Sequence, residues 1–373
     1  MNVYLTAEQI HHALALPDLS NPESGPHAMQ LLLDDVVKAL TSRWSCTVNV
    51  VRTPPLVSVR DNYDRLGYDR RDVTRESRYT RYASPTTMLR SHTSADIPVT
   101  LDSYGHMERL GDVDELIALP GLVYRRDVVD RTHVGEPHQV DLWRLRTTPG
   151  TTEQDLEGMI ATIVDAALPG AQWRTTPAQH SYTHHGRQVD ILYRGDWLEL
   201  AECGLIHRDV LRRSGLDPDR WSGLALGMGL ERALMLRKNI PDIRYLRSTE
   251  PRIAEQMNDL RPWREISLLP PISRDMSIVV DADLDDELLG DRVRAALTDR
   301  IDDIESIEVL ARTGWAELPD KARDRLGLQP HQTNALVRLT LRPLDRTLTD
   351  AEANELRNQV YLAIHDGPHQ ELA

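Results

Sequence analysis

Two short segments of the chain carry polar residues two positions apart among apolar neighbours. Arg125 and Asp127 close the segment 122–127, and Gln139 and Asp141 alternate with apolar residues in the segment 138–143. Side chains two positions apart on a strand lie on one face, so each segment predicts a strand with a polar face. Polar pairs of this kind would be costly against a core. They suit a ligand that is charged at both ends, with Arg125 facing negative charge as it develops.

A second candidate for ligand contact is the segment 222–232, Ser-Gly-Leu-Ala-Leu-Gly-Met-Gly-Leu-Glu-Arg. We expect an apolar strand that runs through Gly227 and Gly229 directly into a helix with Arg232 in its first turns. Glycine has no Cβ, so a flat ligand can lie against the backbone there. The alternative is a strand–helix corner whose glycines only let two elements pack closely.

The segment 222–232 resembles motif 3 of class II aminoacyl-tRNA synthetases, in the version carried by phenylalanyl-tRNA synthetases. Residues 122–143 are similar to the motif 2 hairpin of that family, and 88–94 to its Thr-His-Thr-Ser segment. Residues 197–204 resemble its Trp-Leu-Glu segment with a Gly-Cys-Gly end. The resemblance covers residues 85–373 in the order of the family.

The resemblance implies a ligase that uses ATP and Mg²⁺ to activate an amino acid as an aminoacyl adenylate and transfers it to tRNA. Arg125, on the α-phosphate, and Arg232, on ATP, would be its catalytic residues. The other residues implied at the ATP site are Asp127, His133, Glu199, Gly227 and Gly229. Glu199 is also the candidate Mg²⁺ ligand, a carboxylate that bridges to phosphate oxygens. The residues implied at the amino-acid site are His92, Ser94, Gln139, Asp141, His180, Tyr182 and Ala225, and the loop around His133 would approach the acceptor end of tRNA.

Five positions depart from the pattern of the family. Pro137 stands where a phenylalanine usually stacks on adenine, and Asp141 where glutamate is usual. His180 and Tyr182 replace two phenylalanines that grip the substrate ring, and Glu202 replaces the first glycine of Gly-Cys-Gly. Since buried polar groups require partners, we expect the pocket to prefer a side chain with a hydrogen-bonding group, or a smaller one, over a bare phenyl ring.

Other elements are predicted to position these residues. The three- and four-residue spacing of apolar side chains predicts a helix over 28–44, followed by a strand over 46–52 that ends at Thr-Pro-Pro. This order resembles class II motif 1, which usually builds a dimer interface, so we expect a monomer or a homodimer; an ordinary helix–strand unit is the alternative. Residues 153–168 predict an amphipathic core helix, and 189–201 predict a hairpin.

Residues 266–373 read as β-α-β-β-α-β, and parts of this segment resemble the ferredoxin-fold domain that binds the anticodon in phenylalanyl-tRNA synthetases. The predicted fold is therefore α+β, with a class II antiparallel-sheet catalytic domain followed by a small ferredoxin-like α/β sandwich. The predicted segments are 1–84 with motif 1, 85–250 as the catalytic core, 251–265 as a linker and 266–373. From Arg264 onward 22 acidic residues face 13 basic ones, a poor charge for holding an anticodon.

Composition favours a soluble, cytoplasmic protein without membrane contact. The 373 residues are 40% apolar, contain no apolar run long enough for a membrane span, and begin without the pattern of a secretory signal. Cys46 and Cys203 are the two cysteines, which fits a reducing compartment. The net charge of −14 speaks against broad contact with nucleic acid. The arginines and tyrosines over 60–82 predict a solvated loop, and local RNA contact is the alternative. Phenylalanine is absent, where ordinary usage would give on the order of a dozen.

Three functions stay open at this point. The chain could load phenylalanine onto tRNA, or it could be a repurposed paralog that activates another amino acid for a biosynthetic pathway. It could also be a non-catalytic paralog that binds tRNA. The departures at His180, Tyr182 and Glu202 favour the second function, and the acidic C-terminal segment speaks against the third.

Overall fold

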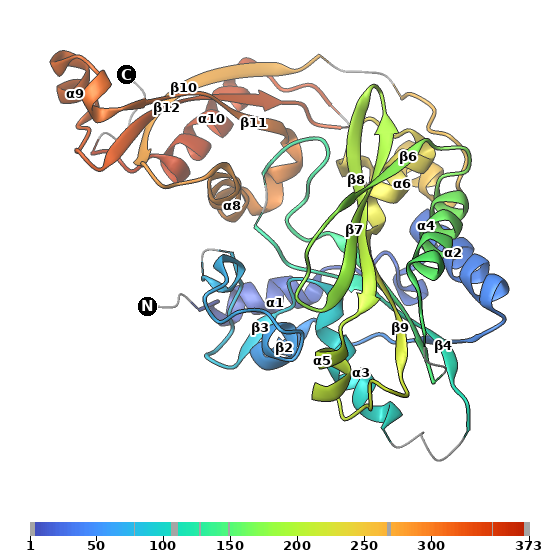
Figure 1. Cartoon of the computed structure of the whole chain (residues 1–373). Coiled ribbons are helices and arrows are strands. Elements are labelled where there is room, and N and C mark those ends of the chain that lie inside the picture. The colour runs from blue at the N-terminus through green and yellow to red at the C-terminus, as the bar shows by residue number, and fades with distance from the viewer. Residues whose placement is uncertain are drawn as a thin grey trace. The chain divides into compact units, whose positions relative to one another are not determined.

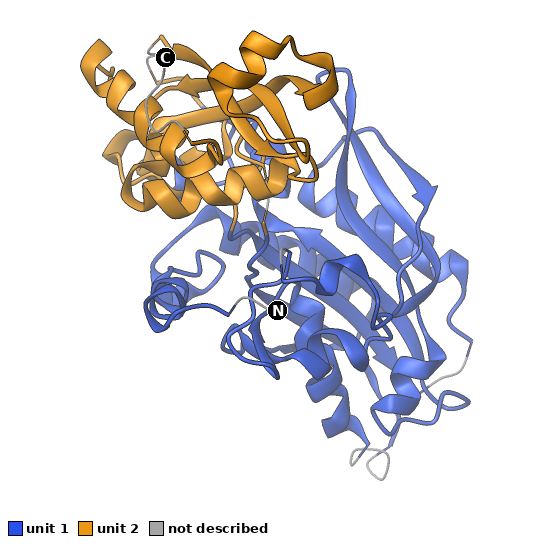
Figure 2. Ribbon diagram, turned by 90° about the vertical axis from the view of Figure 1, so that its left-hand side faces the viewer, with its two compact units in different colours: residues 1–125, 136–240, 256–263 blue, residues 126–135, 241–255, 264–373 orange. Residues whose placement is uncertain are grey.

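The computed structural model of the chain describes residues 4–77, 79–105, 111–126, 128–147, 150–266, 270–344 and 346–368. Packing divides the chain into two compact units, coloured separately in Figure 2. Unit 1 consists of residues 1–125, 136–240 and 256–263, and unit 2 of residues 126–135, 241–255 and 264–373. The segment boundaries predicted after residues 84, 250 and 265 stay predictions.

Unit 1 is built on a seven-stranded sheet in the order β1-β4-β5-β9-β8-β7-β6. Its strands are β1 (Thr47–Val50), β4 (Asp114–Leu122), β5 (His138–Arg146), β6 (Trp173–Pro177), β7 (Thr183–Tyr193), β8 (Asp196–Ile206) and β9 (Ser222–Gly229). β1 pairs with β4 in parallel, and all the other neighbouring strands pair antiparallel. The predicted α+β fold with an antiparallel-rich sheet is confirmed.

Helices α2 (Ala28–Trp44), α4 (Glu153–Ala167) and α6 (Leu230–Lys238) pack together on one face of this sheet, with α2 and α4 side by side (Figure 1). The apolar side chains that predicted α2 and α4 are buried, including Met29 and Leu32 of α2 and Met159 and Ile163 of α4, except that Val37 is half-buried. Both helices therefore form where their periodic apolar faces can leave water. The predicted helix 28–44 is confirmed, and the predicted helix 153–168 ends one residue earlier.

The other face of the sheet is covered in part by α3 (Ile97–Tyr104) and α5 (Arg208–Arg213). Their buried side chains belong to one apolar cluster with Ile117 of β4, Trp143 of β5 and Ala225 of β9. These three strand residues lie opposite one another in register. Further along β5 and β9, this face carries Asp141, which pairs with Gly227, and Gln139, which pairs with Gly229.

The hairpin of β4 and β5 corrects one prediction. The first strand was expected over 122–127, but β4 ends at Leu122, which pairs with His138. Arg125 therefore lies beyond the strand and is exposed. β4 is almost wholly buried on both faces, so it lacks the alternation that reveals a strand, and it contains Pro120, a residue that is unfavourable within a sheet. That proline is tolerated because it lies beyond the last residue of β4 that pairs with β1.

The hairpin predicted over 189–201 is confirmed and is longer, since β7 and β8 have eleven residues each. Its turn, Arg194–Gly195, has positive φ at both positions, 52° and 96°, as a type I′ turn requires. Strand β6, which was not predicted, is a short edge strand that ends at Pro177. The strand predicted over 46–52 is present as β1 and is shorter.

The remainder of unit 1 includes helix α1 (Ala7–Ala15) and a two-stranded sheet of β2 (Leu56–Ser58) and β3 (Thr87–Leu89). Two short turns carry site residues or their neighbours: the π-helical turn η2 (Arg60–Asp64) and the 3₁₀ turn η4 (Thr93–Asp96). Both lie in unit 1.

Unit 2 contains a three-stranded antiparallel sheet in the order β10-β12-β11. Its elements are β10 (Ile272–Asp281), α8 (Asp286–Leu297), β11 (Ile304–Gly314), α9 (Asp320–Leu326), β12 (Gln332–Leu341), α10 (Asp350–Ile364) and the short α7 (Pro251–Ala254). α8 and α10 pack against each other and share one apolar cluster with the strands. The predicted final strand is not formed within the residues described up to 368, although Asp366 N–H donates to Val279 O at 2.7 Å.

Candidate functional site

The Asp141 carboxylate lies in the middle of β5 and is 2% exposed. Thr93 Oγ1 donates to its Oδ2 at 2.6 Å, Ser94 Oγ donates to Oδ1 at 2.7 Å, and Trp143 Nε1 donates to Oδ1 at 3.0 Å. Burial raises the pKa of Asp141, and these three donors oppose the increase. Within the described part of the chain no cationic side chain pairs with this carboxylate.

Strand β9 forms the floor beside Asp141. Gly227 pairs with Asp141 on one side and with Glu202 on the other. Gly227 and Gly229 are half-buried in a strand whose other central residues are buried. Among the described residues, a methyl at Gly227 would approach only the Asp141 carboxylate, at 3.8 Å and 4.0 Å, and one at Gly229 only Arg232 Cβ, at 4.0 Å. This open backbone favours a flat ligand over the tightly packed corner.

Aromatic rings form a wall next to this floor. The Tyr182 ring stacks on Trp143 at a centroid distance of 5.9 Å and lies 5.8 Å from His180 and 6.5 Å from Tyr68. His180 Nε2 lies 3.0 Å from Glu202 Oε2. Burial, followed by the neighbouring Tyr68 and the nearby carboxylates, raises the pKa of Tyr182 far above its usual value, so its phenol stays a neutral hydrogen-bonding group.

His92 lies at the same wall, where its ring stacks on Tyr68 at 5.6 Å with an angle of 10° between the planes. Its ring nitrogens are buried and make no hydrogen bond of good geometry with the described residues. Burial, together with the charges of Arg125 and Arg90, lowers the pKa of His92 to about 3. The imidazole is therefore neutral at physiological pH.

Arginines and a carboxylate lie around the open floor. Arg125 is exposed and its Nε donates to Ser91 O at 3.0 Å, while Arg232 Nη1 donates to Glu199 O at 3.0 Å. Partial desolvation and the Glu202 charge raise the pKa of Glu199, and both arginines oppose that increase. The charges of Arg125, Arg232 and Glu202 therefore all act on the Glu199 carboxylate.

The remaining predicted residues have different positions. Gln139 pairs with Gly229 at the end of β5 and is half-buried, and Ala225 is fully buried opposite Trp143. His133 belongs to unit 2, where its Nδ1 lies 2.9 Å from each Asp130 carboxylate oxygen. Although burial opposes the shift, His133 and the Thr132 donors lower the pKa of Asp130 to about 2. Asp127 lies outside the described residues.

The residues present fit ATP with Mg²⁺. Two arginines next to an open glycine floor match a polyphosphate and a flat base. Mg²⁺ usually uses one or two protein carboxylates together with phosphate oxygens, a role open to Glu199. In the described ranges, no group of three or more His, Cys, Asp or Glu side chains could hold a metal by itself.

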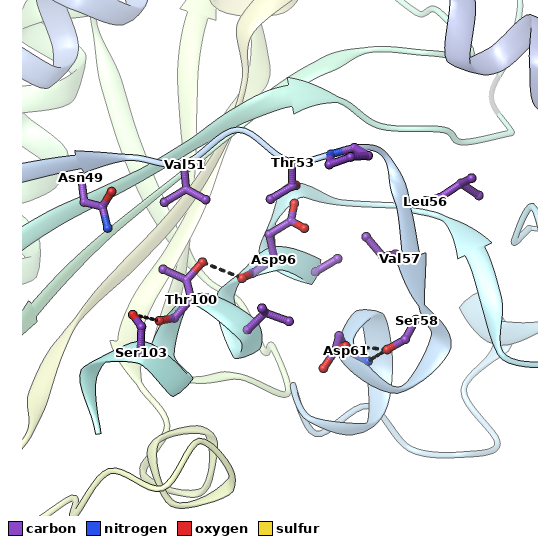
Figure 3. Close-up of a pocket in the computed structure, with 13 residues that line it drawn as sticks. Asn49, Val51, Thr53, Leu56, Val57, Ser58, Asp61, Asp96, Thr100 and Ser103 are labelled. Atoms are coloured by element: carbon purple, nitrogen blue, oxygen red, sulfur yellow. Dashed lines mark hydrogen bonds between the residues drawn. The ribbon is translucent and has the colours of Figure 1, made fainter. Parts of the chain in front are cut away.

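A separate groove of about 470 Å³ lies between the segment after β1 and helix α3 (Figure 3). Val51, Leu56 and Val57 form part of its apolar lining, and Asp96 and Thr100 are among its polar residues. None of the predicted site residues belongs to its lining, so we do not assign it to the candidate site.

Among the helices of the described chain, none is both long and apolar enough to cross a membrane.

The chain belongs to the class II tRNA synthetases: the family model "tRNA synthetases class II core domain (F)" matches residues 14–257. It is 34% identical to the phenylalanine–tRNA ligase alpha subunit of Prochlorococcus marinus (strain MIT 9313) over 207 residues, 56% of this chain and 59% of that protein. It is 30% identical to the same subunit of Nostoc punctiforme (strain ATCC 29133 / PCC 73102) over 256 residues, 69% of this chain and 73% of that protein. These matches confirm the resemblance to the class II family over the catalytic segment, whereas the ferredoxin-fold assignment of residues 266–373 stays a prediction.

The chain thus spans about three fifths of the length of the Prochlorococcus relative. Among solved structures, pyrrolysyl-tRNA synthetase from Desulfitobacterium hafniense aligns with a TM-score of 0.45 and 22% identity, over 59% of this chain and 73% of that one. This likeness is too distant to carry any argument about the site.

Sequence reasoning missed three contributors to the site. Thr93 donates to Asp141 together with Ser94, and Trp143 donates from two positions along the same strand. The alternation of β5 could have placed Trp143 on the Asp141 face. Tyr68 comes from a loop distant in sequence, and no local pattern indicates that it lies against His92 and Tyr182.

Proposed function

We propose that the chain is a ligase that activates an amino acid with ATP as an aminoacyl adenylate and transfers it to tRNA. The observation that carries this proposal is the buried Asp141 carboxylate without a cationic partner in the described residues. A buried carboxylate needs compensation, and three neutral donors provide only part of it. The α-ammonium group of an amino acid would provide the missing positive charge.

The arginines support the adenylation step. Attack by the substrate carboxylate on the α-phosphate builds negative charge that guanidinium groups can stabilise. Arg125 and Arg232 are the candidates for this role, because both act electrostatically on Glu199 next to the open floor. ATP supplies the adenylyl group, and Mg²⁺, held by Glu199 and the phosphates, would offset their charge. The backbone at Gly227 and Gly229 would lie beneath the adenylate.

The proposed macromolecular substrate is tRNA, with its acceptor end at the catalytic unit. Contact of unit 2 with an anticodon is the weaker part of the proposal, because the segment from Arg264 onward carries 22 acidic and 13 basic residues. The relatives are named as alpha subunits. Three states of assembly are therefore proposed as alternatives: a monomer, a homodimer, and a complex with a second kind of chain. We propose the cytoplasm as the compartment, because the chain has only two cysteines, both unpaired, which fits a reducing compartment.

The test is ATP–pyrophosphate exchange by the full chain with each proteinogenic amino acid, followed by aminoacylation of total tRNA. We expect exchange with at least one amino acid and its loss in Asp141→Asn. The control is Asp196→Asn, which also removes one carboxylate from a strand of the same sheet, but at the exposed turn of β8. A folded wild-type chain that exchanges with no amino acid would instead support a non-catalytic, tRNA-binding paralog.

A further inference from the structure

A second carboxylate lies opposite Asp141 across the glycine floor. Gly227 pairs with Asp141 of β5 and with Glu202 of β8, so the three residues form one row across the sheet. Directly paired residues present their side chains on the same face. The two carboxylate-bearing strands are two strand spacings apart, about 10 Å. The Asp141 and Glu202 side chains occupy part of this distance, and an extended aromatic amino acid can reach from one carboxylate to the other.

A continuous set of side chains connects the two carboxylates. Trp143 Nε1 donates to Asp141, and the Trp143 ring stacks on Tyr182. Tyr182 contacts His180, whose Nε2 lies 3.0 Å from Glu202 Oε2. Both carboxylates also act on the Tyr182 phenol. The aromatic wall of Trp143, Tyr182 and His180 therefore lies along the paired residues Asp141, Gly227 and Glu202. Asp141 is at one end of this space and Glu202 at the other.

Glu202 keeps hydrogen-bonding capacity for a ligand. Its side chain is 40% exposed, whereas that of His180 is 10% exposed. His180 is its partner at Oε2, and Oε1 has no partner in the residues that the structure describes. Water can satisfy Oε1 in the free chain. A bare phenyl ring placed against it would remove that water without replacing the hydrogen bond, which is unfavourable for a charged oxygen.

We propose that Glu202 is a specificity-determining residue that selects amino acids whose side chain carries a hydrogen-bond donor, a hydroxyl or an amino group on an aromatic ring, and rejects phenylalanine. This inference rests on the proposed adenylation activity and adds the substrate class. With the α-ammonium at Asp141, the donor of the side chain would bond to Glu202. His180 Nε2 lies 3.0 Å from the other carboxylate oxygen and so restricts the positions that the Glu202 side chain can take. The rings of Tyr182 and Trp143 provide the aromatic surface.

The experiment measures ATP–pyrophosphate exchange by the full chain with phenylalanine, tyrosine, meta-tyrosine and 4-aminophenylalanine. The hydroxyl and amino arms distinguish the two kinds of donor. In the wild type, we expect kcat/KM for the best donor-bearing substrate to exceed that for phenylalanine by about 10²-fold, since a partly exposed acceptor discriminates less than a fully buried one. Equilibrium dialysis of the same amino acids, without ATP, measures binding separately.

Glu202→Gly should reduce that ratio to about tenfold or less, mainly by raising kcat/KM with phenylalanine. Glu202→Gln keeps the size of the side chain and an acceptor, so it should retain part of the preference; it is also the second variant if the glycine destabilises β8. Asp196→Asn, a neutral change at the exposed end of the same strand, should leave the ratio unchanged.

The inference is overturned if the wild type activates phenylalanine at least as well as every donor-bearing analogue. An unchanged ratio in both Glu202 variants overturns it as well. In both cases exchange is still observed, so the proposed adenylation survives. Exchange only with a non-aromatic amino acid also overturns this inference and leaves the proposed adenylation intact. Exchange with none of these four and none of the proteinogenic amino acids is a different result, which refutes the proposed function and this inference together.

Discussion

The substitution Gly227→Ala tests whether β9 is the floor of a ligand site. A methyl at Gly227 would lie 3.8 Å and 4.0 Å from the Asp141 carboxylate oxygens, which is ordinary contact. The folded chain should therefore accept alanine, with a gain of about 0.5–1 kcal/mol because alanine loses less conformational entropy on folding. A bound ligand that lies flat on this backbone would meet the new methyl directly.

The size of the effect follows from overpacking. Inserting a methyl into a filled space is unfavourable by about 1–3 kcal/mol, which corresponds to a decrease of roughly 5- to 150-fold in kcat/KM. The assay is ATP–pyrophosphate exchange with the best amino acid, together with urea unfolding of the same preparations. We expect a lower kcat/KM and an unchanged or slightly higher free energy of unfolding.

Gly223 on the same strand is the matched contrast. A methyl there would lie 1.9 Å from the backbone oxygen of Arg144 and 2.8 Å from Ile206 Cδ1, so Gly223→Ala should lower the free energy of unfolding by about 3 kcal/mol or more. If Gly227→Ala keeps both its stability and the wild-type kcat/KM, no ligand lies against this backbone, and the reasoning about the floor is wrong.

Four further predictions concern charge, the pocket wall, pH and composition. Arg125→Ala and Arg232→Ala should each lower exchange by about 10²- to 10³-fold, without unfolding seen by circular dichroism; near-normal exchange in either variant would contradict its assigned role. His180→Phe combined with Tyr182→Phe should shift exchange toward phenylalanine, and a wild type that already selects phenylalanine over tyrosine, leucine and histidine would refute the polar-wall argument. The pKa of His92 is lowered to about 3, so the unfolded chain takes up a proton below its usual value of about 6.5 that the folded chain does not. The free energy of unfolding should therefore fall as the pH decreases from about 6.5 toward 3, and urea titrations of His92→Gln should show a shallower fall. Finally, a chain without phenylalanine should still be synthesised in a host in which the charging of tRNA with phenylalanine is inhibited, as pulse labelling would show. If its synthesis falls as steeply as that of other proteins, the alternative is favoured, in which phenylalanine was lost by drift under GC-rich codon bias.

Several features could be predicted because they depend on local geometry. The period of the apolar residues predicted α2 and α4, since a helix repeats its face every 3.6 residues regardless of what it packs against. The apolar segment with the spaced glycines Gly227 and Gly229, followed by Arg232, predicted a strand that leads into a helix, as β9 and α6 do. β4 could not be found in this way because both of its faces are buried, and a strand of that kind shows no alternation.

The amino-acid sequence by itself determined the family and the residue types that are available: Asp141 on a strand, glycines beside it, and Glu202 where a glycine is usual. Only the tertiary structure decided which of them face one another. The strand order places Gly227 between Asp141 and Glu202, and a distant loop brings Tyr68 to Tyr182. The physical reason is that periodicity reports the orientation of a side chain relative to its own backbone. Which strands become neighbours across a sheet depends on strand order, which the pattern within one strand does not specify.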